Sequence, residues 1–176
     1  MPLVVAPTLQ DVYTLLRAYI AGIVPVGVMV TQGLGNRVPM PPVLPGFVCM
    51  TATLLNPHRT PETSWDQVGL DPTAIVIEQG MLVRIQLDCY GADSADWAVM
   101  LAATMRTDYA CTALAPVAPL YCDNPIQAAL VNGEEQFEER WIVGANLQYN
   151  PVITTPMQFA AEAVVSTINV DERYPP

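Results

Sequence analysis

A run in the middle of the chain alternates between two kinds of side chain, and this alternation is the feature that most constrains the fold. One series is wholly apolar, and the other is mostly polar: Met81, Val83, Ile85, Leu87 and Cys89 against Leu82, Arg84, Gln86, Asp88 and Tyr90. Successive side chains of a strand point to opposite faces of a sheet, so the run predicts a strand with one buried face. Residues 137–149 alternate in the same way and predict a second such strand.

Two other segments are predicted to be helices, and in the first of them apolar residues recur at steps of three and four, which is the period of a helix. The first helix is predicted over 8–23, because Thr8 and Asp11 have the spacing of a capping box and Pro25 ends the segment. The second is predicted over 94–113. Its middle is apolar nearly all round, so we expect this helix to lie buried against the sheet.

The remaining segments complete an α+β fold, a mainly antiparallel sheet packed by two helices on one face. Further strands are predicted over 26–32, 47–55, 74–78 and 164–170, with a short helix or loop over 157–163. The segment 47–55 is apolar on both faces and is predicted to be central, whereas the prolines of 33–45 exclude a central strand there. Asn132-Gly133 is typical of a type I′ turn and predicts a hairpin within 126–147.

The length of 176 residues fits one domain with a core of its own. We therefore expect residues 1–176 to form a single domain. The proline-containing segment 56–72 is predicted to be an extended arm or loop, so the domain would carry a protruding arm over 53–73.

The charge balance excludes one class of function. The chain has 7 arginines, no lysine and 17 acidic residues, which gives a formal charge of −10. Nucleic-acid binders gain affinity by neutralising phosphates with basic side chains, so this chain is not expected to bind DNA. Only 14% of the residues are charged and 52% are hydrophobic, which favours a homo-oligomer over a monomer with a generous core.

No segment predicts a membrane span or a signal peptide. The most apolar stretch near the N-terminus, residues 20–30, holds two glycines and a proline, and a spanning helix needs about 20 apolar residues. No basic region precedes an apolar one, so a soluble, cytoplasmic chain is predicted.

The sequence predicts neither a zinc site nor a nucleophilic catalytic site. Cys49, Cys89, Cys111 and Cys122 are widely spaced and His58 is the one histidine, so a zinc site is not predicted. The cysteines are expected to be reduced and mostly buried, with Cys49 and Cys89 on strands. No nucleophile elbow or phosphate-binding loop is present.

Two acidic groups have a functional and a structural interpretation. Asp88, Asp93 and Asp96 could bind Mg²⁺ at a strand-to-helix junction, but Asp93 and Asp96 are equally the residues that favour a helix N-terminus. Glu134, Glu135, Glu138 and Glu139 form an acidic run on the predicted hairpin. This run either faces something negatively charged or keeps the outer surface soluble.

Short motifs run along the chain from about Leu9 to the C-terminus. The first are Gln32-Gly33, Asn36-Arg37-Val38-Pro39-Met40-Pro41, Gln86-Leu87-Asp88, Gly91 with Ser94-Ala95-Asp96, Arg106-Thr107-Asp108-Tyr109-Ala110 and Pro119-Leu120-Tyr121. The others are Asn132-Gly133-Glu134, Glu139-Arg140-Trp141, Asn150-Pro151-Val152, Gln158-Phe159-Ala160, Val170-Asp171 and Tyr174-Pro175-Pro176. In order and spacing they resemble the neck terminator (tail terminator) proteins of tailed bacteriophages, least over 53–73.

The resemblance implies a non-enzymatic virion protein without a cofactor. Such a protein forms a ring, usually a hexamer, that ends the tail tube and joins it to the head-side connector. The implied partners are further copies of the chain, the tail tube protein, with the sheath as a further candidate, and the connector or stopper protein. Genomic DNA passes through the ring without specific binding, and the ring is assembled in the host cytoplasm before it resides in the virion neck.

With the resemblance, the acidic run becomes a candidate for the wall of the DNA channel. Two alternatives to the terminator ring stay open on the sequence. One is another ring protein of the virion, a stopper or tube subunit. The other is a metal-dependent hydrolase built on Asp88, Asp93 and Asp96, which a divalent-metal titration would detect.

Overall fold

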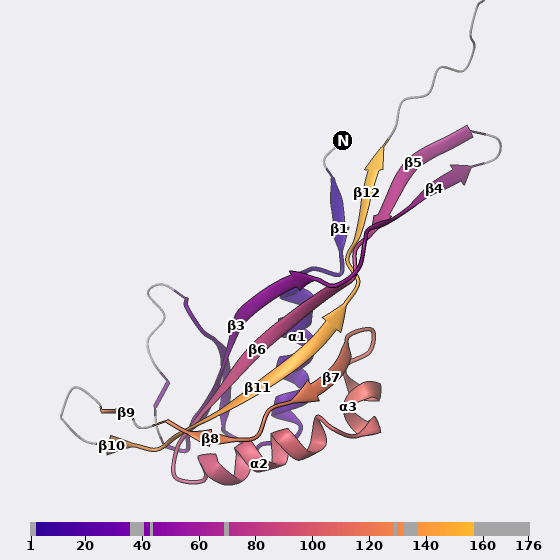
Figure 1. The fold of residues 1–176 in the computed structure, drawn as a ribbon. Helices are drawn as coiled ribbons and strands as arrows, with labels where there is room; N and C mark the ends of the chain where they lie inside the picture. The colour runs from indigo at the N-terminus through magenta and orange to yellow at the C-terminus, as the bar shows by residue number, and fades with distance from the viewer. Residues whose placement is uncertain are drawn as a thin grey trace, which may run out of the picture.

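The computed structural model describes residues 3–35, 41–42, 44–68, 71–128, 130–131 and 137–156. Figure 1 shows an elongated molecule with a six-stranded sheet in the middle, a four-stranded sheet at one end and a two-stranded hairpin at the other. The predicted α+β class with mainly antiparallel strands is confirmed. The described residues contain three helices where two were predicted.

The central sheet has the strand order β2-β3-β6-β11-β7, and β8 also pairs with β11. Its strands are β2 (Met29–Gln32), β3 (Phe47–Pro57), β6 (Met81–Tyr90), β7 (Ala118–Cys122), β8 (Ile126–Gln127) and β11 (Arg140–Tyr149). Only the β2–β3 pair is parallel within this sheet.

The first alternating run forms β6, and residues 140–149 of the second form β11; these strands pair from end to end at the centre of the sheet. The strand predicted over 137–149 is wrong as a single element, because residues 137–138 form the separate strand β10. The strand predicted over 47–55 is confirmed as β3, and the strand predicted over 26–32 is confirmed in its second half as β2. Strand β7 was not predicted, because Pro119 argues against a central strand. In the structure β7 lies on the far side of the sheet from β2, where a missing N–H is tolerated.

Helix α1 (Leu9–Ala21) begins with the predicted capping box. The Asp11 N–H donates to Thr8 Oγ1 at 3.2 Å, and the Thr8 N–H donates to Asp11 Oδ2 at 2.7 Å. These two bonds satisfy backbone donors that the first helical turn leaves without partners. The pKa of Asp11 lies below its ordinary value because the Thr8 backbone and hydroxyl donate to the carboxylate.

The helix predicted over 94–113 is wrong as a single element. It is divided into α2 (Ser94–Thr104) and α3 (Asp108–Ala113). Thr107 has an extended backbone, with φ −122°, and stands as the N-cap of α3. Its hydroxyl donates to the Thr104 carbonyl at 2.7 Å, and this local bond competes with continued helical pairing.

The core lies between the helices and one face of the central sheet. Leu16 of α1 and Leu101 of α2 meet Ile85 and Leu87 of β6 and Leu147 of β11, all at most 1% exposed. The predicted buried face of β6 is thereby confirmed. The opposite face of the sheet, which we call the open face, carries no helix in the described part of the chain (Figure 1).

The second sheet has the order β1-β12-β5-β4 and is antiparallel throughout. Its strands are β1 (Val4–Ala6), β12 (Val152–Pro156), β5 (Asp71–Glu78) and β4 (Glu62–Val68). The strand predicted over 74–78 is confirmed as part of β5. The segment predicted as an arm or loop, 56–72, contains β4 and the start of β5, which project away from the helices (Figure 1).

The predicted hairpin is present, but its register differs from the predicted one. Strands β9 (Leu130–Val131) and β10 (Phe137–Glu138) pair Val131 with Phe137. A two-residue turn at Asn132-Gly133 would pair Val131 with residue 134, so that register is wrong. The turn residues themselves, and the segments predicted over 157–163 and 164–170, lie outside the described residues.

Candidate functional site

The open face holds an ion pair between its two central strands. Arg140 of β11 donates from Nη2 and Nε to Asp88 Oδ1 of β6, at 2.7 and 3.0 Å. Gln86 Nε2 donates to both carboxylate oxygens of Asp88 at 3.0 Å. Asp88 is 5% exposed, so these donors replace the water that the carboxylate loses.

Aromatic rings extend this pair along the face. Tyr90 stacks on Phe47 with ring centroids 4.4 Å apart, and the Arg140 guanidinium lies 5.6 Å from the Tyr90 centroid. Burial is the largest single effect and lowers the pKa of Arg140, but the hydrogen bonds to Asp88 and the negative charge of that carboxylate together leave the pKa raised. Burial raises the pKa of Tyr90. These groups form a charge-compensated structural cluster.

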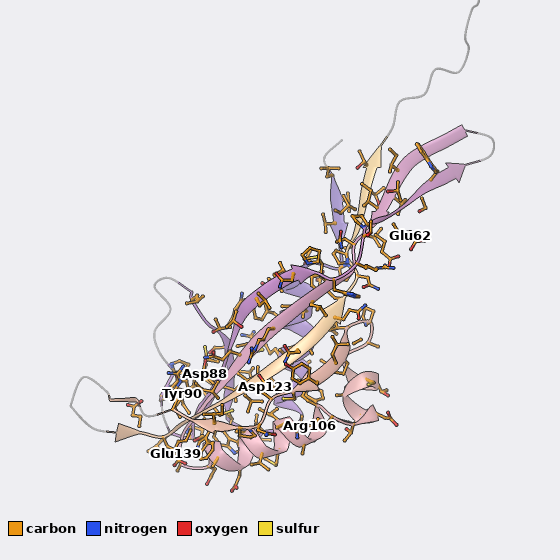
Figure 2. The ribbon with its side chains drawn as sticks, in the orientation of Figure 1. Glu62, Asp88, Tyr90, Arg106, Asp123 and Glu139 are labelled. Carbon is orange, nitrogen blue, oxygen red and sulfur yellow. The ribbon has the colours of Figure 1, made fainter. Side chains whose placement is uncertain are left out.

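A second ion pair on the open face joins Arg84 of β6 to Asp123, which follows β7. It lies over Gly144 of β11, where an added Cβ would come within 2.2 Å of Asp123 Oδ2. Beside this pair is a depression of about 330 Å³, lined in part by Gln86 and Asn124. Figure 2 shows Asp88, Tyr90 and Asp123 along this region of the sheet.

The structure does not gather the three aspartates of the hydrolase alternative into a metal site. Asp88 is held by Arg140 on the open face, whereas Asp93 is the N-cap of α2 and Asp96 lies in its first turn. Among the described residues, no three His, Cys, Asp or Glu side chains are grouped so that they could hold a metal ion. The observed positions of Asp93 and Asp96 match their interpretation as helix N-terminal residues.

The four glutamates predicted to line a channel are divided between described and undescribed residues. Glu134 and Glu135 lie outside the described residues, whereas Glu138 lies on β10 and Glu139 follows it. Glu139 Oε1 accepts a hydrogen bond from Trp141 Nε1 at 3.0 Å. Figure 2 shows Glu139 and Glu62, the latter on β4, at opposite ends of the molecule.

The four cysteines are free thiols. Cys89 and Cys122 are buried, Cys49 is half-buried rather than buried as predicted, and Cys111 is exposed. Burial raises the pKa of Cys89 to about 12 and that of Cys122 to about 11. Because the thiolate is the nucleophile and a high pKa leaves little of it near neutral pH, neither buried cysteine has the character of a reactive thiol.

Large apolar side chains are exposed at both edges of the central sheet. On or beside β2 they are Val26, Met29, Leu34 and Leu44, and on β7 and α3 they are Tyr109, Leu120 and Tyr121. Val99 and Met100 are exposed on α2, which packs on β11 and β6. The four-stranded sheet adds Val4, Val5 and Trp65. Exposed apolar patches of this kind typically mark surfaces that partners cover.

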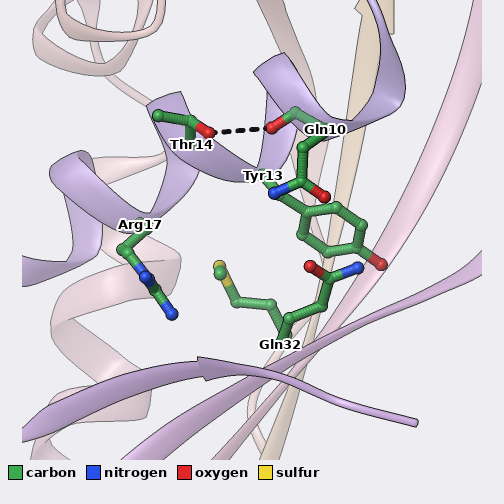
Figure 3. Close-up of a pocket in the computed structure, with 6 residues that line it drawn as sticks. Gln10, Tyr13, Thr14, Arg17 and Gln32 are labelled. Atoms are coloured by element: carbon green, nitrogen blue, oxygen red, sulfur yellow. Dashed lines mark hydrogen bonds between the residues drawn. The ribbon is translucent and has the colours of Figure 1, made fainter. Parts of the chain in front are cut away.

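A polar groove lies between α1 and the edge strand β2. Gln10, Tyr13, Thr14 and Arg17 form one stripe of α1, and Gln32 and Met50 close the other side around about 100 Å³. Figure 3 shows the stripe, with the Thr14 hydroxyl donating to the Gln10 carbonyl at 2.9 Å. The Tyr13 hydroxyl accepts the Ala52 N–H at 2.7 Å, which fixes α1 to β3.

The pair Arg140–Asp88 and the groove around Arg17 were not singled out by the sequence. Both depend on contacts between segments that are far apart in the chain. The one available signal was the ratio of 7 arginines to 17 acidic residues, because such an excess of acids favours ion pairs for the arginines.

The described residues contain no helix that is both long and apolar enough to cross a lipid bilayer. No protein of curated function matches the chain. A family model described as phage neck terminator protein matches residues 10–173, which is nearly the whole chain. The predicted resemblance is thus confirmed, and the chain belongs to the phage neck terminator family, whose members are structural proteins of the virion neck.

Proposed function

We propose that this protein forms a closed ring, most simply of six copies, that ends the tail tube and joins it to the head-side connector. The observation that carries the proposal is the pair of exposed apolar edges on the central sheet, one beside β2 and one beside β7. A contact between two different surfaces of the same subunit generates a ring when the rotation closes. Family membership supports the same location in the virion.

The ring acts as a mechanical joint, without catalysis and without a cofactor. Its partners are further copies of the chain, the tail tube protein, and the connector or stopper protein, with a sheath as an additional candidate. We propose that residues 1–176 fold as one domain and that the predicted arm, 53–73, reaches a neighbour with the part that follows β3, since residues up to Pro57 pair with β6. The projection of β4 and β5 beyond the helices supports the arm (Figure 1).

The DNA channel is the second part of the proposal. Six copies would carry six times −10, or a formal charge of −60. An acidic wall repels the phosphate backbone most strongly in a narrow channel, so DNA traverses it without being held. We propose that Glu134, Glu135, Glu138 and Glu139 line the lumen, with the alternative that they keep the outer surface soluble.

The ring is tested by making phage particles without this protein. The expected result is that full heads and finished tail tubes accumulate unjoined, and that the protein supplied in trans joins them. Joined, infectious particles made in its absence would contradict the proposal. The position that this protein occupies in wild-type particles distinguishes a terminator from a stopper or a tube subunit.

The lumen assignment is tested by placing lysine at all four glutamate positions. The assembled particles are expected to eject DNA slowly, and added salt should relieve the defect because it screens the new contacts. Glutamine at the same positions is the matched control, since it removes the charge without creating an attraction. Normal ejection at low salt by fully assembled lysine particles would place these residues outside the lumen.

A further inference from the structure

Arg17 is a cation that has no partner among the residues that the structure describes, in a strongly acidic chain. Within the described residues, Arg59, Arg84 and Arg140 pair with acids, and Arg106 donates to the Cys122 carbonyl and to Asn124. Arg17 makes no hydrogen bond or ion pair with any described residue, although it is exposed at the mouth of the α1–β2 groove (Figure 3).

The groove has the chemistry of a carboxylate site. Arg17 offers the fork of N–H donors that suits a carboxylate, and the side-chain amides of Gln10 and Gln32 supply further donors. The volume of about 100 Å³ suits the end of one acidic side chain, and Met50 closes the groove with an apolar surface. The ligand class is therefore an aspartate or glutamate side chain presented by another surface.

Asp108 is an acidic residue that lies at the opposite side of the central sheet from the groove. It is exposed at the start of α3, and its carboxylate makes no hydrogen bond or ion pair within the described part of the chain. Helix α3 packs beside β7, whereas the groove lies beside β2 at the other side of the sheet. On α1, Tyr19 faces α3 and Tyr109, so Arg17 lies on a different side of the helix from α3.

We propose that Asp108 of one copy enters the α1–β2 groove of the next copy and pairs there with Arg17. The inference rests on the proposed ring and names the contact that closes it. In this contact the exposed Tyr109, next to Asp108, packs against the exposed Met29 of the neighbouring copy. The burial of these two apolar side chains contributes to the affinity between the copies. The ion pair makes the contact specific for this surface and fixes the alignment of one copy against the next, as charged groups at interfaces commonly do.

The test is charge reversal at both ends of the contact. Arg17→Asp and Asp108→Arg each create a like-charge contact at every interface, so each variant is expected to lose ring association by about tenfold or more. Arg17→Asp/Asp108→Arg in one chain restores opposite charges and should recover association to within about threefold of wild type. Native mass spectrometry and sedimentation measure these populations.

Two controls separate pairing from net charge and from folding. Arg17→Asp/Asp96→Arg has the same net charge as the rescued variant but should remain defective, because Asp96 lies on α2. An equimolar mixture of the two single variants should form rings in which the variants alternate, since each interface then joins opposite charges and a ring of six permits alternation. Each variant is expected to melt like wild type, because both side chains are exposed and neither pairs with another described residue.

Each outcome decides between the two proposals. If wild type forms rings and the single variants do so equally well, or if Asp96→Arg rescues as well as Asp108→Arg, the Arg17–Asp108 contact is wrong while the ring stands. If wild-type protein forms no ring, either alone or on tail tubes, the proposed ring itself is wrong.

Discussion

Arg140 and Asp88 form a two-donor ion pair across the two central strands, with Nη2–Oδ1 at 2.7 Å and Nε–Oδ1 at 3.0 Å. The side chain of Asp88 is 7% exposed and that of Arg140 is 23% exposed. Because water cannot replace the guanidinium easily at this depth, the pair holds the open face of the sheet in one arrangement. The open face is thus structural around this pair.

Removing the cation of this pair should destabilise the fold. Arg140→Met leaves the buried Asp88 carboxylate without its counter-ion, and we expect a loss of about 2–3 kcal/mol in the free energy of unfolding. Urea denaturation measures it. Asp88→Asn/Arg140→Met should be more stable than Arg140→Met, because no uncompensated charge remains. Equal stability of Arg140→Met and wild type would contradict the structural role.

Gly144 is required by the packing of the second ion pair. Gly144→Ala places a methyl group where Asp123 Oδ2 lies 2.2 Å away, so Asp123 must leave Arg84. We expect a loss of about 0.5–1 kcal/mol, because the atoms in the way are the ends of two side chains that can move aside, and a part-exposed ion pair contributes little. Gly22→Ala is the control, because an added Cβ there meets its nearest atom at 3.4 Å and φ is −79°. If both variants melt alike, Asp123 does not lie over Gly144.

The Tyr13 hydroxyl satisfies a backbone group of β3. Tyr13→Phe keeps the ring but leaves the Ala52 N–H without its acceptor, at a bulge where β3 changes register. The expected loss in stability is about 1–2 kcal/mol. Tyr121→Phe, at a hydroxyl that is exposed on β7, should change the stability little. A result in which the two variants are indistinguishable would argue against the hydrogen bond.

The elements that the sequence predicted are those with local signals. Strands β6 and β11 follow from alternation, and α1 follows from its apolar stripe and the Thr8–Asp11 capping box. The break between α2 and α3 depends on one extended residue, Thr107, within a segment of helical composition. Of the second sheet only part of β5 was predicted. Strands β1 and β12 were missed because they pair distant parts of the chain, such as Val4 with Thr154, and β4 was missed because the prolines of its segment indicated a loop.

The candidate contact surfaces were missed for the same reason. Composition predicted that apolar side chains would be exposed to partners, but it did not say which ones. The groove at Arg17 forms only when α1 lies beside β2, and the sequence alone gives no distance between these elements. The acidic run at 134–139 was visible as a cluster, yet its direction relative to a channel depends on the assembly.

Thiol reactivity should follow the burial of the cysteines. At pH 8, Cys111 is expected to be alkylated first by iodoacetamide, with Cys89 and Cys122 protected in the folded protein. Peptide mass spectrometry gives the order. Fast labelling of Cys89 under native conditions would show that β6 is not at the centre of the sheet.

The raised pKa of Cys89 also has a consequence for stability. The folded thiol titrates at about 12, above its ordinary value of 9.0, so the folded state holds its proton more tightly. Its contribution to stability is complete below about pH 9 and is lost as the pH rises toward 12. Cys89→Ala should therefore lose less stability than wild type between pH 9 and the upper end of this range, measured by urea denaturation. If the stabilities of wild type and Cys89→Ala fall equally with rising pH, the raised pKa of Cys89 is wrong.

The proposed ring is tested most directly by electron microscopy of purified protein mixed with purified tail tubes. We predict a closed ring at one end of each tube, with the exposed β2 edge of each subunit against the α3 and β7 side of the next. Protein that remains monomeric, leaves the tube ends bare, or coats the tube along its length would contradict this account.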